Sequence, residues 1–320
     1  QDVHNYAESG NLGEISEACV DKIADDAIDS VTIDGKVYGV PYNAWYQGVI
    51  YNKNIFEEYQ LTPPNTLGEM EEIVNVLEAH GITPFAGHYQ ESWKVANMTM
   101  QYMMNDVFCN DPEWGDEFRM GKRSFEDDEN IRQCMMNQKY VKEHSFRDSV
   151  LIDQFESDSR FMNGEAAMYM TGSWSMQFAD EYDGEVRFGI FPYPNQNGDS
   201  KLIRETNMTF MKGGNTAYSE IFLKLLEDEK IIREIITFTQ SSSVIKNVEI
   251  EGDKALQEDI DYYESQGQII DVTIGNSQLV WDFQNAFAEQ VLLWLKGEKK
   301  LDDVLKYADN NRSYSVFMEE

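Results

Sequence analysis

The sequence DGKVYGVPYNAWYQGVIYNK, residues 34–53, decides the fold. It begins with Asp-Gly, a two-residue turn signal with nearly alternating apolar residues on both sides, and this pattern predicts a β-hairpin over 31–40. The apolar run 49–51 predicts a buried strand that ends at an Asn-Lys turn. We interpret residues 42–47, between the hairpin and this strand, as a connection.

The connection carries side chains suited to a polar ligand such as a sugar. Three aromatic residues and two amides occupy five of its six positions. Aromatic faces stack on the apolar faces of a sugar ring, and amides bind its hydroxyl groups. A packed structural corner is the alternative, because aromatic residues also fill cores. We predict ligand contacts from Asn43, Trp45, Tyr46 and Gln47.

Helices and short strands alternate along the whole chain, which is typical of the α/β class. Residues 66–80 are the best-marked helix, with Thr66 and Glu69 in a capping-box pattern and Gly81 in position to end it. A second helix, predicted to run to about residue 108, contains several methionines that we expect in the core.

A second aromatic segment follows a predicted strand at 166–170. A turn at Gly172 places Trp174 just beyond the carboxyl end of that strand, where open α/β folds bind ligands. Ser173 is in position to cap a short helix there. We therefore predict Trp174 as a ligand contact.

Two further tryptophans lie among polar residues at the starts of predicted helices. Trp93 follows Glu91 in the segment 88–93, and Trp281 opens a long helix over 278–296. A tryptophan on an amphipathic helix also fits a structural place in the core. We include Glu91, Trp93 and Trp281 among the candidate ligand contacts.

Composition argues against several classes of partner. The chain has 320 residues, enough for about two domains. Its 26 Lys and Arg residues against 58 Asp and Glu residues give a formal net charge of −32. This charge repels phosphates and anionic lipids, so we expect no binding to nucleic acid or to a membrane surface. A solvated, acidic exterior is the simplest interpretation of the charge.

The sequence lacks the motifs of common enzyme classes. It contains no GxSxG elbow, no GxxxxGK[ST] loop, no HExxH and no dinucleotide fingerprint. Its four histidines are isolated and its three cysteines have no CxxC spacing. We predict no catalytic residues, no cofactor and no metal site. A glycosidase-like pair of carboxylates stays an alternative, because such a pair is defined by its separation in space.

Four motifs together resemble the extracellular solute-binding proteins of ABC importers. They are DGKVYGVPY, YNKNIF, FMNGEAAMYMTGSW ending at Trp174, and FGIFPYP over 188–194. The chain is most similar to the sugar-binding type, family 1, which includes maltose-binding protein. The resemblance implies a periplasmic-binding-protein-like fold, with two lobes, a hinge and a ligand cleft between them. One lobe would comprise 1–41 and 207–255, and the other 42–206 and 256–320.

The resemblance also implies a function. It implies capture of a sugar, in particular an oligosaccharide, and its delivery to a membrane permease by a monomeric lipoprotein outside the cell or in the periplasm. It adds Asp2 and Asn207 to the candidate ligand contacts. The alternatives are a polyamine, peptide or anion as the ligand, or a carbohydrate-active enzyme. Because the opening residues resemble the middle of a lobe, we expect relatives to have further residues before them.

Overall fold

The computed structural model describes residues 2–314 except 178, 180–185, 207–208, 212, 214–223, 226–227, 240, 247, 249–253 and 273–278. The chain divides into two compact units. Unit 1 comprises Gln1–Tyr46 and Arg204–Gln257, and unit 2 comprises Gln47–Ile203 and Glu258–Glu320. These boundaries lie within five residues of the predicted lobe boundaries. The assignment of the units as lobes around a ligand stays a prediction.

Unit 1 contains the predicted β-hairpin. β1 (Thr32–Ile33) and β2 (Lys36–Val37) pair antiparallel. Asp34 has φ 49° and Gly35 has φ 73°, so both turn residues lie in the left-handed region, as a two-residue hairpin loop requires. The hairpin prediction is confirmed.

The remainder of unit 1 is built from short elements around a small apolar core. β3 (Gly39–Pro41) pairs antiparallel with β9 (Thr209–Met211). The core includes Ile23, Ile232 and Val244, all buried. The helices are α1 (Asp2–Glu8), α2 (Glu17–Val20), α3 (Asp25–Ile28), the 3-10 turn η1 (Asp29–Val31) and α11 (Glu229–Thr239).

The prediction that residues 42–47 form a connection between two strands is wrong for residues 43–47. Residues 43–47 belong to β4 (Asn43–Asn52), a ten-residue strand that continues without a break from unit 1 into unit 2. The strand starts early because β10 (Ser242–Ser243) pairs with Asn43 and Ala44. That partner lies some 200 residues further along the chain, so local sequence gave no sign of it.

The described residues form one seven-stranded sheet with the path β11-β8-β4-β6-β5, and β7 and β10 also pair with β4. β4 is antiparallel to β6 and β7, whereas β5 and β6 are parallel. The strands are β5 (Thr83–Ala86), β6 (Ala166–Gly172), β7 (Phe188–Phe191), β8 (Leu202–Glu205) and β11 (Ile269–Asp271). All seven residues of β6 are buried, as expected for a central strand.

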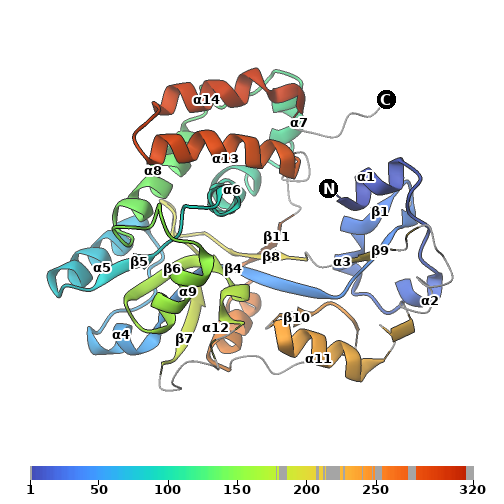
Figure 1. Cartoon of the computed structure of the whole chain (residues 1–320), viewed down its shortest axis with the longest axis horizontal. Coiled ribbons are helices and arrows are strands. Elements are labelled where there is room, and N and C mark those ends of the chain that lie inside the picture. The colour runs from blue at the N-terminus through green and yellow to red at the C-terminus, as the bar shows by residue number, and fades with distance from the viewer. Residues whose placement is uncertain are drawn as a thin grey trace. The chain divides into compact units, whose positions relative to one another are not determined.

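Helices pack around this sheet in unit 2 (Figure 1). In that view α13 and α14 lie side by side, and α6 packs against both α13 and α8. The elements are α4 (Lys53–Glu58), α5 (Leu67–Ala79), α6 (Ser92–Met103), the π-helix η2 (Met104–Phe108), α7 (Trp114–Arg119), α8 (Glu129–Glu143), α9 (Gln154–Met162), η3 (Ser173–Met176), α12 (Lys254–Ser265, which starts in unit 1), α13 (Trp281–Leu295), α14 (Leu301–Asn310) and η5 (Arg312–Tyr314).

The observed caps of α5 are those predicted from the sequence. The Thr66 side chain accepts a bond from the Glu69 amide, and the Glu69 carboxylate accepts one from the Thr66 amide. Gly81 has φ 76°, the left-handed conformation that ends a helix. The capping-box and stop predictions are both confirmed.

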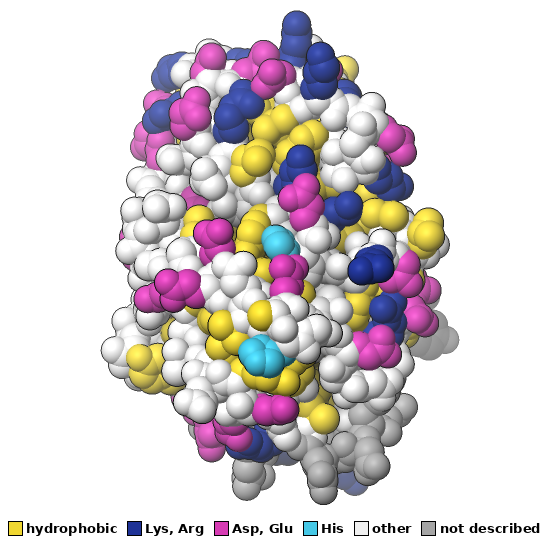
Figure 2. All heavy atoms as spheres, turned by 90° about the vertical axis from the view of Figure 1, so that its left-hand side faces the viewer, with side chains coloured by type: hydrophobic (Ala, Val, Ile, Leu, Met, Phe, Trp, Pro, Cys, Tyr) yellow, Lys and Arg dark blue, Asp and Glu magenta, His cyan; other side chains and the backbone are white. Residues whose placement is uncertain are grey.

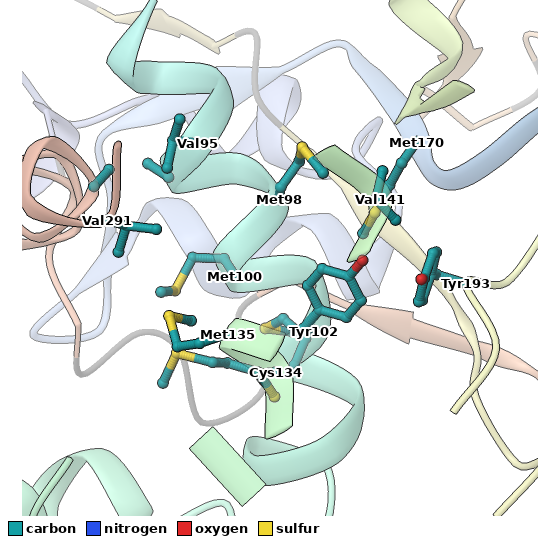
Figure 3. Close-up of a cluster of buried hydrophobic side chains, with 14 of the residues drawn as sticks. Val95, Met98, Met100, Tyr102, Cys134, Met135, Val141, Met170, Tyr193 and Val291 are labelled. Atoms are coloured by element: carbon teal, nitrogen blue, oxygen red, sulfur yellow. The ribbon is translucent and has the colours of Figure 1, made fainter. Parts of the chain in front are cut away.

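The core of unit 2 confirms the prediction for the methionines. Met98, Met100, Met103 and Met104 are all buried. Figure 3 shows Met100 beside Met135 of α8, and Met98 near Val141 and Met170. The rings of Tyr102 and Tyr193 pack edge to face in the same view, with 4.6 Å between their centroids. Unbranched methionine side chains fill the irregular space between helices.

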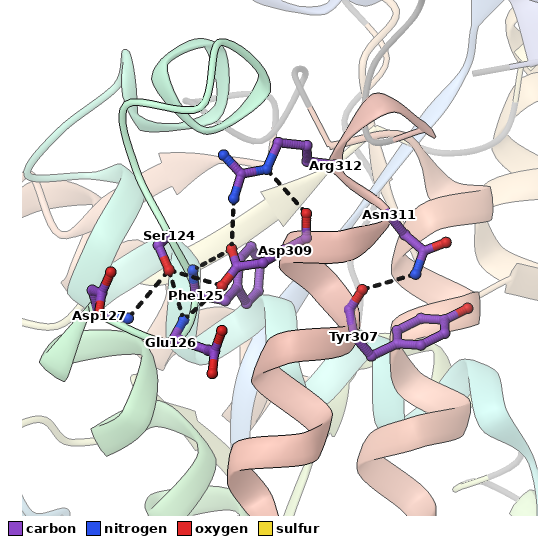
Figure 4. A network of polar contacts seen from close by, with 8 residues as sticks. All are labelled: Ser124, Phe125, Glu126, Asp127, Tyr307, Asp309, Asn311 and Arg312. Atoms are coloured by element: carbon purple, nitrogen blue, oxygen red, sulfur yellow. Dashed lines mark hydrogen bonds and ion pairs between the residues drawn. The ribbon is translucent and has the colours of Figure 1, made fainter.

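One carboxylate fastens a loop of unit 2 to the end of α14 (Figure 4). Asp309 accepts hydrogen bonds from Ser124 Oγ at 2.8 Å and from the amides of Phe125 at 2.9 Å and Glu126 at 3.1 Å. Arg312 donates to the same carboxylate. The ring of Phe125, held in this way, packs on Phe283 and Phe287 of α13.

One face of the molecule is mixed in charge. Figure 2 shows acidic, basic and small apolar patches interspersed over the face that it draws. Within the described parts of the chain, no helix has the length and apolar character needed to cross a bilayer. The same residues contain no cluster of His, Cys, Asp or Glu suited to a metal ion.

Candidate functional site

The end of β6 presents an indole ring. Gly172, the last residue of β6, pairs with Gln47 of β4. Its backbone is extended, with φ −122°, so any residue type fits its conformation. A Cβ atom there would nevertheless overlap three carbons of the six-membered ring of Trp174. The half-buried indole of Trp174 therefore lies directly against the main chain at Gly172.

The prediction that Ser173 caps a helix is wrong. The N-cap of the 3-10 turn η3 is Gly172, and no side chain makes a cap hydrogen bond there. Ser173 itself is buried, with an exposed fraction of 4%. The later part of the helix predicted at this point lies outside the described residues.

A chain of amides supports Gln47 from α6. Gln101 Nε2 donates to Asn97 Oδ1 at 3.0 Å, and Asn97 Nδ2 donates to Gln47 Oε1 at 3.0 Å. Gln47 and Gln101 are each only 3% exposed, whereas Asn97 is half-buried. Gln47 thus lies beneath the surface, opposite Gly172 in the sheet. Asn97 and Gln101 were not predicted; their four-residue spacing on one helix face was the only available signal.

A buried lysine binds the same end of β6. Lys94 is fully buried, and its Nζ donates to the Met170 carbonyl at 2.6 Å. The last β6 residue paired with β5 is Tyr169, opposite Ala86. Lys94 therefore supplies a donor at the first residue beyond the β5 pairing. Burial lowers the pKa of Lys94 to about 7, although the charges of Asp158 and Glu91 oppose this change.

Ionisable groups surround this lysine. Burial raises the pKa of Asp158 to about 6, with the Tyr169 hydroxyl and the Lys94 charge acting in the opposite direction. Burial and the charge of Lys94 together lower the pKa of His88 to about 2, so His88 is neutral near pH 7. His88 ring atoms lie near Trp93, with 5.5 Å between the ring centroids.

Glu91 makes contacts within unit 2. Its Oε2 accepts a hydrogen bond from the Gln154 amide at 3.1 Å and lies 3.2 Å from His88 Nδ1. It therefore links the loop after β5 to the first turn of α9. Its neighbour Trp93 is half-buried, and Trp281 is 42% exposed at the first residue of α13.

Two of the predicted contacts in unit 1, Asn43 and Trp45, bind residues where α11 ends. Asn43 is fully buried and its Nδ2 donates to Ser241 Oγ at 3.1 Å. Trp45 Nε1 donates to the Thr239 carbonyl at 3.3 Å, and its side chain is half-buried. Tyr46 is 7% exposed. Asn207 and the side chain of Asp2 lie outside the described residues.

Residues 1–260 match the family described as bacterial extracellular solute-binding protein, and the chain belongs to that family. Among curated relatives, the chain is 24% identical over 247 residues to the multiple sugar-binding protein of Streptococcus mutans, covering 70% of this chain and 55% of that protein. The chain thus spans about half the length of this relative.

Solved structures share the fold. A sugar transporter from Bacillus licheniformis in complex with stachyose aligns with a TM-score of 0.81 and 16% identity, over 97% of this chain and 82% of that one. A chitin oligosaccharide binding protein aligns with a TM-score of 0.78 and 18% identity, over 98% and 81%. The α/β fold predicted from the sequence is therefore that of solute-binding proteins.

Proposed function

We propose that the chain is the ligand-binding component of an ABC importer for a sugar, in particular an oligosaccharide, and that it delivers this sugar to a membrane permease. Membership of the solute-binding family supports the binding role. The sugar-binding names of the relative from Streptococcus mutans and of the two solved structures support the substrate class.

The observation that carries the proposal is the contact between Trp174 and Gly172. An indole fixed against the main chain at the carboxyl end of β6 offers a rigid, partly exposed apolar surface. A sugar ring has an apolar face of similar size, and stacking on such a ring needs no further ordering of the side chain. Trp174 is the main stacking residue in this proposal.

The exposure of the other predicted contact residues decides the role that we assign to each of them. Trp45, Trp93 and Trp281 are at least partly exposed and are the further stacking residues of the proposal. Gln47, which pairs with Gly172, is buried, so we assign it to supporting Trp174 from beneath. Asn43 and Tyr46 are buried within unit 1 and stay predicted contacts. Glu91, Asn207 and Asp2 stay predicted contacts to sugar hydroxyl groups.

We further propose that binding is reversible and non-catalytic, so that the sugar leaves intact. The protein would act as a monomer outside the cell, held by a lipid anchor at the outer face of the cytoplasmic membrane, or in the periplasm. Its protein partner would be the membrane permease. These statements extend the family role to this chain.

A thermal-shift series tests the ligand class. The probes are raffinose, stachyose, chitotriose, spermidine, a tripeptide and inorganic phosphate. A ligand that binds only the folded state raises the melting temperature. We expect a rise with one or more of the sugars and full chromatographic recovery of the intact sugar after incubation. A rise only with spermidine, peptide or phosphate would overturn the sugar assignment, and sugar cleavage would overturn the non-catalytic one.

A further inference from the structure

A hollow of about 540 Å³ opens beside the first turn of α9 in unit 2. We propose that it is a second sugar subsite, in which the ring of Phe155 stacks on one unit of the oligosaccharide bound at Trp174. This inference rests on the proposed function and adds to it a subsite and a residue that the sequence did not indicate. The lining residues are Gln90, Leu151, Ile152, Asp153, Phe155 and Glu156.

Two large apolar side chains in this hollow face solvent. Phe155 is 74% exposed and Leu151 is 73% exposed. Single exposed apolar residues are ordinary, but two that line one hollow rimmed by polar groups form the kind of surface that binds a ligand. Neither side chain packs into the apolar core of unit 2. Phe155 therefore contributes little to folding and is available to a ligand.

The polar residues of the hollow match a sugar. Gln90 supplies an amide, and Asp153 and Glu156 supply carboxylates, all groups that bind hydroxyls. Asp153 Oδ1 accepts a hydrogen bond from the Glu156 amide at 3.0 Å, which fixes the Asp153 carboxylate at the start of α9. An aromatic face with amide and carboxylate neighbours is the combination that a neutral, hydroxyl-rich ring requires.

The topology places this hollow at the same edge of the sheet as Trp174. Only three residues, 163–165, connect α9 to β6, so the two run antiparallel and α9 starts where β6 ends. The bond from the Gln154 amide to Glu91 ties that start to the loop after β5. One turn further, Asp158 lies beside the hydroxyls of Tyr169 and Ser175, which flank the end of β6.

Calorimetric titration of Phe155→Ala with raffinose, stachyose and chitotriose tests the subsite. Phe238→Ala is a matched control, because Phe238 on α11 of unit 1 is 70% exposed and lines no part of the hollow. We expect Phe155→Ala to weaken binding of the sugar that the unmodified chain binds by about tenfold, with an unchanged melting temperature. Phe238→Ala should leave the affinity unchanged.

The Trp174→Ala variant distinguishes a failure of the subsite at Phe155 from a failure of the proposed sugar binding. Weaker binding in Trp174→Ala together with unchanged binding in Phe155→Ala would overturn the subsite alone. No sugar binding to the unmodified chain would overturn the proposed function and this inference with it. If Phe155→Ala weakens spermidine binding and no sugar binds, the carboxylates of the hollow serve a cation, which overturns the sugar subsite.

Discussion

The six-membered ring of Trp174 occupies the space that a side chain on Gly172 would need. This close contact, and not the backbone conformation, requires the glycine, since the conformation suits any residue. A single methyl group at position 172 would therefore act on the position of the indole while leaving the strand geometry possible. The substitution Gly172→Ala therefore tests the contribution of the Trp174 indole to ligand binding.

We predict that Gly172→Ala displaces the indole and weakens sugar binding by at least about tenfold, close to the effect of Trp174→Ala. Tryptophan fluorescence and calorimetric titration with the bound sugar measure the two effects. Gly213→Ala is the control, because a Cβ atom there would meet open space. Unchanged affinity in a folded Gly172→Ala variant would remove Trp174 from the site.

We predict that Asn97→Ala lowers the free energy of unfolding by about 1–3 kcal/mol, because Gln47 loses a donor and Gln101 loses an acceptor in a buried setting. Urea denaturation measures the change. The exposed Asn130 on α8 offers a control with the same substitution. Sugar affinity should fall as well, since Gln47 lies opposite Gly172. Equal stability of the two variants would show that the amide chain is not stabilising.

Stability should depend on pH through two partly buried carboxyls, those of Asp106 and Asp158. Burial raises the pKa of Asp106 and of Asp158 to about 6. An unfolded aspartate titrates near about pH 3.9, so between about pH 4 and 6 the folded state binds more protons than the unfolded state. The free energy of unfolding contributed by these groups therefore falls as pH rises through this range.

Asp106→Asn and Asp158→Asn should each reduce this fall, by on the order of 1–3 kcal/mol. Urea denaturation at pH 4, 5, 6 and 7 provides the measurement. Asp303→Asn, on the exposed side of α14, controls for the change in net charge. The same pH slope in all three variants would contradict the assignment of the slope to these two groups.

We predict that Asp309→Asn destabilises unit 2 by about 1–3 kcal/mol, because an amide nitrogen would face donors that now meet a carboxylate oxygen. Asp302→Asn is the control. Asp302 is an exposed residue of the same helix whose ion pair with Arg132 should contribute about 1 kcal/mol or less. Thermal unfolding distinguishes them, and equal melting temperatures would show that the loop is held by other contacts.

Sequence reasoning succeeded where the signal was local. The hairpin at Asp34-Gly35 and the capping box of Thr66 and Glu69 are set by a few adjacent residues, and both are confirmed. The extent of β4 was not predictable, because its first residues pair with Ser242 and Ser243. Strand pairing over such separations leaves no mark in the local pattern.

The candidate site was predictable only in part for the same reason. The place of Trp174 at the end of β6 followed from a strand and a glycine in sequence. The burial of Gln47 depends on Asn97, and the contact of Lys94 depends on Met170, which are both far away along the chain. Phe155 was not predicted from the sequence, because the exposure of a side chain is a property of the folded surface.

The bonds that Asp309 makes also bear on the order of folding. The loop at Ser124 and Phe125 is fastened by a residue that is synthesised about 185 positions later. Contacts over such separations form slowly and only after the intervening chain has collapsed. During synthesis from the amino end, this loop stays unfastened until α14 has left the ribosome, so unit 2 cannot complete its folding before α14 has been made.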